Sequence, residues 1–219
     1  MHVHDKIKQS SKAHIVYKLQ NGKKVPGTTT ILSVLNKPAL IHWAWELGME
    51  GIDYRTYRDT TARIGTLAHY LVQCDMTGET PDMSEYSPLE VDQAENSLLS
   101  YYEWRKGKNI VAIENELPLV SEQYEYGGTI DILAEVDGEL WLVDVKTGKA
   151  IYPEMLCQLA AYRQLLNENG YEAQKAKILR IGRDETEGFE ERTITDFSKH
   201  WELFYHCLQI FKIQKELGG

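Results

Sequence analysis

Three charged residues near the middle of the chain have types and spacing suited to metal-assisted chemistry on a β-sheet. Asp131 and Asp144 flank the dipeptide Asp137-Gly138, and Lys146 follows Asp144 by two residues. Because Asp-Gly favours a type I′ turn, the segment predicts a β-hairpin closed at this dipeptide. A two-residue loop, or a four-residue loop starting one pair further out, places Asp131 directly opposite Asp144, whereas a bulged loop would not. Opposed residues of an antiparallel pair have Cβ atoms about 4.5–5.5 Å apart, so these like charges repel each other.

The residues around the two carboxylates make that repulsion stronger. Both predicted strands carry apolar side chains beside the acids, which indicates a nearby core of low dielectric constant. Two carboxylates there need a shared proton or a cation between them. Lys146 projects from the same face as Asp144, about 6.6–6.8 Å further along the strand, and a divalent metal with oxygen ligands would also relieve the clash. The sequence therefore predicts two acids and a lysine that converge at one point of a sheet.

The elements that must position these residues are helices and strands in alternation. Apolar residues at helical spacing predict helices at 28–35, 39–50, 54–76, 88–106 and 198–217, and a further helix with Pro153 in its first turn and Gly170 at C′. Besides the central hairpin, alternating patterns predict strands at 109–120, 175–183 and 189–194, and a short hairpin at 14–26. Pro118 indicates the end of its strand or a strand at the sheet edge.

Three motifs in these elements resemble those of a known family. Asp131, followed by Asp144-Val145-Lys146, resembles the D…(D/E)-x-K core of the PD-(D/E)XK nuclease superfamily. Gln158 and Tyr162 resemble the QxxxY motif of its RecB-like branch, and the run from Gly65 to His69 resembles that branch's G-(S/T)-x-x-H motif. The motifs follow the family's order over about residues 60–165, and residues 28–44 resemble the lead-in of phage and prophage members.

The resemblance implies an architecture for the chain. We expect an α/β fold with a mixed central β-sheet flanked by helices, the restriction-endonuclease-like PD-(D/E)XK core. A single domain would span residues 1–219, with a lead-in of hairpin and helix at residues 1–50. This length suits one domain of ordinary size.

The resemblance also implies the ligands of a metal ion. Asp131, Asp144 and the backbone carbonyl of Val145 would bind Mg²⁺ or Mn²⁺, and His69 would complete or extend the site. A lone histidine is more often structural than a ligand, so the assignment of His69 depends on its motif. Family members often place a glutamate on the preceding strand. Glu116 is our choice, although an exposed strand face carrying Glu114 and Glu116 explains both acids nearly as well.

The same resemblance suggests roles for the remaining motif residues. Lys146 would orient the attacking water and offset negative charge in the transition state. Gln158 and Tyr162, four residues apart on a helix, share one face and can reach one target. They would support the active site or position the DNA strand; without the motif, a helix surface with an interfacial tyrosine explains them.

Composition limits the compartment and the cofactors. The segment before residue 13 has no apolar signal region and no run approaches 18 apolar residues, so we expect a cytoplasmic protein without membrane spans. Three widely separated cysteines argue against a disulfide framework and a zinc finger. Some RecB-like relatives hold an iron–sulfur cluster on four cysteines, and we expect no iron–sulfur cluster here.

The net charge of −9 is unfavourable for contacts with phosphate, but its distribution is uneven. Basic residues gather in three places: the N-terminal lysines, Arg55, Arg58 and Arg63 before His69, and Lys175, Lys177, Arg180 and Arg183 on a late strand. Each group is also explained as a solvated face. Together with the motifs, the sequence predicts DNA as the partner.

The predicted function is that of a divalent-metal-dependent DNA exonuclease acting in recombination, repair or phage DNA processing. The resemblance implies products with a 5′-phosphate and a 3′-hydroxyl, and the lead-in implies a single-strand annealing protein as a partner. Three alternatives remain: an endonuclease, a non-catalytic DNA-binding or assembly subunit with the same fold, and a structural carboxyl pair in an unrelated hydrolase. No feature of the sequence indicates a subunit number.

Overall fold

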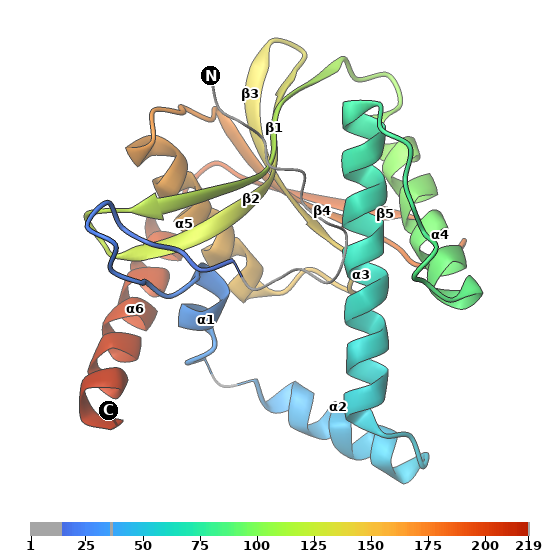
Figure 1. Cartoon of the computed structure of the whole chain (residues 1–219), viewed down its shortest axis with the longest axis horizontal. Coiled ribbons are helices and arrows are strands. Elements are labelled where there is room, and N and C mark those ends of the chain that lie inside the picture. The colour runs from blue at the N-terminus through green and yellow to red at the C-terminus, as the bar shows by residue number, and fades with distance from the viewer. Residues whose placement is uncertain (1–14, 36, 219) are drawn as a thin grey trace.

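A five-stranded mixed sheet forms the centre of the protein, as the computed structural model shows for residues 15–35 and 37–218 (Figure 1). The strands are β1 (Ile110–Ser121), β2 (Tyr126–Val136), β3 (Glu139–Lys146), β4 (Lys175–Ile181) and β5 (Phe189–Ile194), in that spatial order. β3 and β4 are parallel, and the other neighbouring pairs are antiparallel. The predicted α/β fold with a mixed central sheet is confirmed.

Helices cover both faces of this sheet. They are α1 (Thr28–Leu32), α2 (Pro38–Met49), α3 (Tyr54–Thr77), α4 (Pro88–Arg105), α5 (Pro153–Glu168) and α6 (Ser198–Gly218). One hydrophobic core joins the sheet to α1, α5 and α6, and a second joins its other face to α3 and α4. α5 connects the parallel strands β3 and β4, as a crossover helix does. Among the described residues, no helix is both long and apolar enough to cross a membrane.

The predicted elements are present with small differences at their ends. α1 is shorter than the predicted 28–35 because the chain continues after Leu32 in i→i−3 turns, with Val34 and Leu35 donating to the carbonyls of Ile31 and Leu32. The predicted hairpin at 14–26 is a single antiparallel bridge between Lys18 and Lys24. Its first residue and the basic residues Lys6, Lys8 and Lys12 lie outside the described residues.

The central hairpin has the predicted turn. Asp137 and Gly138 have φ values of 52° and 86°, and Val136 pairs with Glu139 across them. Positive φ at both central residues defines the type I′ turn. The ladder then runs inward without a bulge to Ile132 and Val143, so the register is the predicted one.

Strand β1 departs from the predicted regular alternation. Its pairing with β2 shifts by one residue between Ala112 and Glu114, and Glu116 has a φ of 49°. A β-bulge adds one residue on one strand, and positive φ is strained for a residue with a side chain. The bulge lies before Glu114, so the register from Glu114 onward is continuous, and the backbone at Glu116 departs from regular strand geometry. Pro118 lies inside β1, which is an edge strand, where proline is tolerated.

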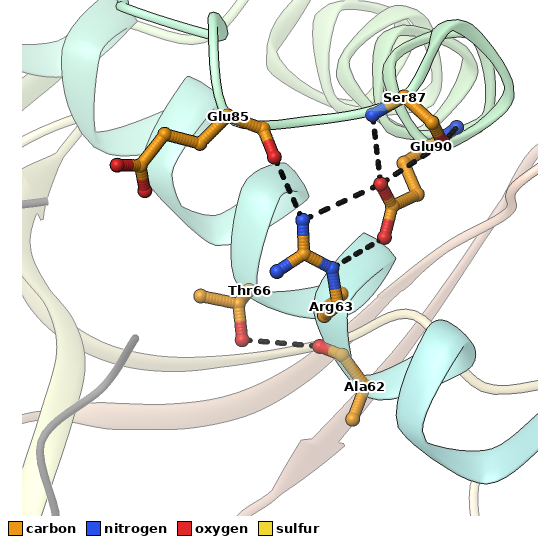
Figure 2. A network of polar contacts seen from close by, with 6 residues as sticks. All are labelled: Ala62, Arg63, Thr66, Glu85, Ser87 and Glu90. Atoms are coloured by element: carbon orange, nitrogen blue, oxygen red, sulfur yellow. Dashed lines mark hydrogen bonds and ion pairs between the residues drawn. The ribbon is translucent and has the colours of Figure 1, made fainter. Parts of the chain in front are cut away.

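A polar network holds α4 against α3 (Figure 2). The side chain of Ser87 accepts the N–H of Glu90 at the start of α4, while the carboxylate of Glu90 accepts the N–H of Ser87 at 2.8 Å. Arg63 of α3 donates to the same carboxylate at 2.6 Å and to the main-chain carbonyl of Glu85 at 2.9 Å. The network connects the two helices just before α3 reaches His69.

We expect Glu90→Gln to reduce the stability of the protein at neutral pH by about 1–2 kcal/mol, because the buried carboxylate loses its ionic bond to a half-exposed arginine. Arg63 lowers the pKa of Glu90 from 4.5 to about 2. A depressed carboxyl pKa stabilises the fold above the unfolded pKa, so this contribution is lost as the pH falls from about 4.5 towards 2. Urea unfolding across this range should show the wild-type advantage shrinking. Glu85→Gln, whose main-chain carbonyl makes the contact, is the control.

Two glycines of β2 allow aromatic rings to lie directly on the strand. A Cβ at Gly128 would lie 2.5 Å from Cε1 of Tyr162 and 3.0 Å from Oγ1 of Thr28, and a Cβ at Gly127 would lie 2.3 Å from the ring of Tyr17. Tyr17 donates to or accepts from Thr129 at 2.8 Å. The absence of a β-carbon at Gly128 thus lets Tyr162 lie beside the sheet, and its absence at Gly127 does the same for Tyr17.

Gly128→Ala is expected to cost about 1–3 kcal/mol, because the new methyl group overpacks the buried ring of Tyr162. The melting temperature should fall by several degrees, at roughly 2–4 °C per kcal/mol for a chain of this size. Gly48→Ala is the control: it lies in α2 with nothing within 4 Å of its Cβ position, so it should raise stability by about 0.5–1 kcal/mol. Equal melting temperatures for the two variants would contradict this account.

Candidate active site

Three carboxylates lie in one row across neighbouring strands. The β1–β2 register pairs Asn115 with Ile132 and Leu117 with Ile130, so Glu116 lies opposite Asp131. The β2–β3 register ends at Ile132 and Val143, and its next pair outward is Asp131 and Asp144, as predicted.

Beyond Ile132 and Val143, the side chain of Asp131 makes the next hydrogen bond between β2 and β3. Its Oδ2 accepts the N–H of Val145 at 2.9 Å, which holds the carboxylate between β2 and β3. Asp131 is therefore fixed by the same strand that carries Asp144 and Lys146.

His69 reaches this row from α3. Its Nδ1 lies 3.7 Å from Oδ2 of Asp131 and 3.8 Å from Oε1 of Glu116, and one potential ligand atom from each of the three residues lies within 4.8 Å of the others. Ligands of one ion at about 2.1 Å lie about 3.0–4.2 Å apart, so a small contraction would suit Mg²⁺ or Mn²⁺. Two carboxylates and an imidazole fit a divalent metal, and Glu116 is part of this set.

Asp144 is placed differently from the other two acids. It is fully buried and its Oδ2 lies 2.5 Å from Nζ of Lys146, while its Oδ1 has no hydrogen-bond partner among the described residues. Burial raises the pKa of Asp144 to about 6, the charge of Asp131 adds to this, and Lys146 opposes it. A buried carboxylate oxygen without a partner is the kind of group that an ion or a water satisfies.

Lys146 stays protonated in this environment. Burial alone would lower its pKa, but the negative charges of Asp144, Asp131 and Glu116 raise the pKa of Lys146 above its ordinary value. A lysine that holds its proton acts as a fixed positive charge and a donor, and it cannot act as a general base. The predicted convergence of two acids and a lysine is present in the structure.

Gln158 and Tyr162 form a buried pair on α5. Nε2 of Gln158 donates to the hydroxyl of Tyr162 at 2.7 Å, so the two residues share a helix face as predicted. Burial raises the pKa of Tyr162 well above its ordinary value, and the nearby charges of Asp144 and Asp131 act in the same direction. The pair therefore lies close to the row of acids and remains neutral.

The small pocket in front of the site includes residues that the sequence did not identify. It is lined by His69, Val72, Gln73, Asn115, Glu116, Asp131, Ile132 and Val145. Gln73 lies four residues after His69 and thus on the same face of α3, so helical spacing could have found it. Asn115 could not be found this way, because it reaches the pocket through the pairing of β1 with β2 and not through helical spacing. Gly65, in the predicted motif, gives room to Oγ1 of Thr147, which lies 3.0 Å from its Cβ position.

The basic residues of β4 are already paired with acids. Lys177 contacts Glu191, Arg180 lies 3.5 Å from Glu190, and both basic side chains are buried. Lys175 contacts Glu139 of β3. Lys177 and Arg180 therefore stabilise the sheet and are not a solvated face.

The chain is an α/β domain in which acids, a histidine and a lysine meet at the open end of a β-hairpin, away from its turn. The family model of the PD-(D/E)XK nuclease superfamily matches residues 42–212, well over half of the chain. The chain belongs to the PD-(D/E)XK nuclease superfamily. Nucleases of this superfamily use divalent metals, and membership implies DNA as the substrate.

Two solved structures are similar to the chain, both with low sequence identity. LHK-Exo in complex with dAMP shares 11% identity with a TM-score of 0.42, over 72% of this chain and 80% of that one. SSO0001 shares 16% identity with a TM-score of 0.30, over 69% of this chain and 74% of that one. At these values neither structure adds an argument about activity. No curated protein matches the chain.

Proposed function

We propose that the chain is a divalent-metal-dependent deoxyribonuclease that hydrolyses phosphodiester bonds from DNA ends, in recombination, repair or phage DNA processing. The row of Glu116, Asp131 and Asp144, with His69 on one side and Lys146 on the other, carries this proposal. These residue types match both the ligands and the counter-charge that phosphodiester hydrolysis requires.

Each side chain has a defined part in the proposed reaction. His69, Glu116 and Asp131, together with Asp144 and the carbonyl of Val145, would hold the ion. A bound ion would supply Lewis-acid activation of the scissile phosphate and of the attacking water.

Lys146 acts on the substrate in this proposal, and the helix α5 supports the site. The charge of Lys146 would orient the water and offset negative charge that develops on the phosphate. Tyr162, held by Gln158 and by the space beside Gly128, would support the acids from within the fold, because both side chains of the pair are buried. The preference for DNA ends rests on the combination of His69 with the Gln158–Tyr162 pair, which resembles the branch that contains end-processing exonucleases.

The test is degradation of end-labelled linear DNA beside a closed circle, with Mg²⁺, Mn²⁺ or EDTA. We expect metal-dependent loss of the linear DNA alone, and Lys146→Ala should abolish it. The position of the surviving label then gives the direction of digestion. Cleavage of the circle would replace the exonuclease with an endonuclease, and DNA binding without cleavage by the wild type would favour a non-catalytic subunit.

A further inference from the structure

The arm formed by α2 and the first turns of α3 extends away from the sheet (Figure 1). Residues 51–59 are all exposed, and Leu47 is the buried residue of α2. Trp43 packs edge-on against Tyr54 and Tyr57, with ring centroids 6.4 and 5.7 Å apart, so the aromatic contact fixes α2 against α3. Within the described part of the chain, the arm is thus an ordered surface that no other element covers.

One face of α3 leads from this arm to the candidate active site. At 100° per residue, Arg58 lies about 20° and Arg55 about 40° from the direction of His69 around the helix. At 1.5 Å per residue, they lie about 16 and 21 Å from His69 along the axis. The positions between them on this face are Ala62, Gly65 and Thr66, which are small and uncharged.

The three arginines of α3 have different surroundings. Arg63 lies on another side of the helix, where Glu90 and the carbonyl of Glu85 hold its guanidinium (Figure 2). Arg58 is 56% exposed and pairs with its sequence neighbour Asp59, an exposed contact of the kind that contributes little. Arg55 is also exposed. Arg55 and Arg58 are therefore accessible on the face that ends at the site.

We propose that Arg58 and Arg55 bind backbone phosphates of the part of the DNA that has not yet been cut. For a spacing of 3.4 Å per base pair, these phosphates lie about five and six nucleotides from the scissile phosphate, respectively. The occupant of this face is a DNA strand because its exposed basic side chains lie on the same helix face as the candidate active site, with only small, uncharged residues between them and His69. This inference rests on the proposed function and extends it with a DNA-binding surface. One face of α3 would hold the DNA backbone and align it with His69.

The test is DNA binding by the Arg55→Gln/Arg58→Gln double variant, measured by fluorescence anisotropy on a linear 30-base-pair duplex in EDTA, where no cleavage occurs. Each phosphate contact contributes about 0.9 to the slope of log K against log salt, so the slope should fall by about 1.8 and the Kd should rise about tenfold at 0.1 M salt. Lys199→Gln/Lys215→Gln, which removes two exposed charges from α6, is the matched control. It should leave the slope unchanged.

A modified substrate tests the position of the contacts. Neutral methylphosphonate linkages at the fifth and sixth phosphates from the end should weaken wild-type binding as much as the double variant does, and should add nothing to the variant's defect. The same linkages at the twelfth and thirteenth phosphates should weaken both proteins equally.

Several results would overturn the inference. These are an unchanged salt slope, an equal effect of the α6 control, additive effects of the variant and the modified linkages, or a change in sedimenting mass without a change in DNA affinity. The last result would assign the arm to a protein partner. Failure of the proposed function is separate: a wild type that shows the arginine-dependent binding but does not cleave with Mg²⁺ or Mn²⁺ leaves this inference standing.

Discussion

Asp131→Asn is expected to abolish metal-dependent cleavage of DNA while leaving the metal-free protein at least as stable as the wild type. The amide oxygen of asparagine can still accept the N–H of Val145, which the carboxylate accepts at 2.9 Å. Burial raises the pKa of Asp144 most, and the charge of Asp131 adds to it; the substitution removes that charge, so the repulsion between the two acids disappears. The same change removes a ligand from the group of His69, Glu116 and Asp131.

The two effects can be measured separately. Cleavage of labelled linear DNA should fall by at least about 10³-fold, the loss seen when a single charge-stabilising group is removed. Mn²⁺ at about 100 times its Kd should stabilise the wild type by about 2.7 kcal/mol, several degrees in melting temperature, and should not stabilise the variant.

Glu135→Gln provides the matched control for this prediction. It removes the same charge from an exposed position of the same strand, and should retain both cleavage and stabilisation by Mn²⁺. An Asp131→Asn protein that is stabilised by Mn²⁺ as strongly as the wild type would remove Asp131 from the metal site.

Lys146→Met is expected to reduce the rate of cleavage by about 10³-fold and to preserve Mn²⁺ binding. The positive charge of Lys146 lies 2.5 Å from Asp144 and opposes a cation at the site, so its removal should not weaken the affinity for the ion. The Lys146→Met variant lacks the ammonium group that would donate a hydrogen bond beside the reacting phosphate. A large fall in rate with retained Mn²⁺ stabilisation separates this role from that of a ligand.

Lys149→Met, three residues later and exposed, is the control and should cleave like the wild type. Loss of Mn²⁺ binding in Lys146→Met would mean that the lysine instead organises the ligands. In that case Asp144, which is fully buried and has lost the positive charge of Lys146, would bind a proton and no longer serve as a ligand.

Local signals were sufficient for the sheet's central hairpin and for most helices. The Asp137-Gly138 turn predicts the register, and with it the alignment of Asp131 and Asp144, and the unbulged turn of the structure selects this register over that of a bulged loop. Proline and glycine signals likewise located both ends of α5. These features depend on a few neighbouring residues, so the sequence reveals them directly.

Features that depend on distant residues were not predictable. The bulge of β1 and the positive φ of Glu116 arise from pairing with β2, and no local residue signals them. The sequence places Arg63 with Arg55 and Arg58 before His69, but Arg63 pairs with Glu90 on another helix. Lys177 is in a segment that reads as a basic patch, but a neighbouring strand supplies its acid.

The position of β3 inside the sheet has a consequence for synthesis of the chain. β3 carries Asp144 and Lys146, and its second neighbour, β4, follows later in the sequence, at Lys175–Ile181. An inner strand is stable when both edges are paired, so the site should become complete once β4 has left the ribosome and joined the sheet. A nascent chain that ends before β4 would carry every proposed catalytic residue, and we expect that it would still not cut DNA.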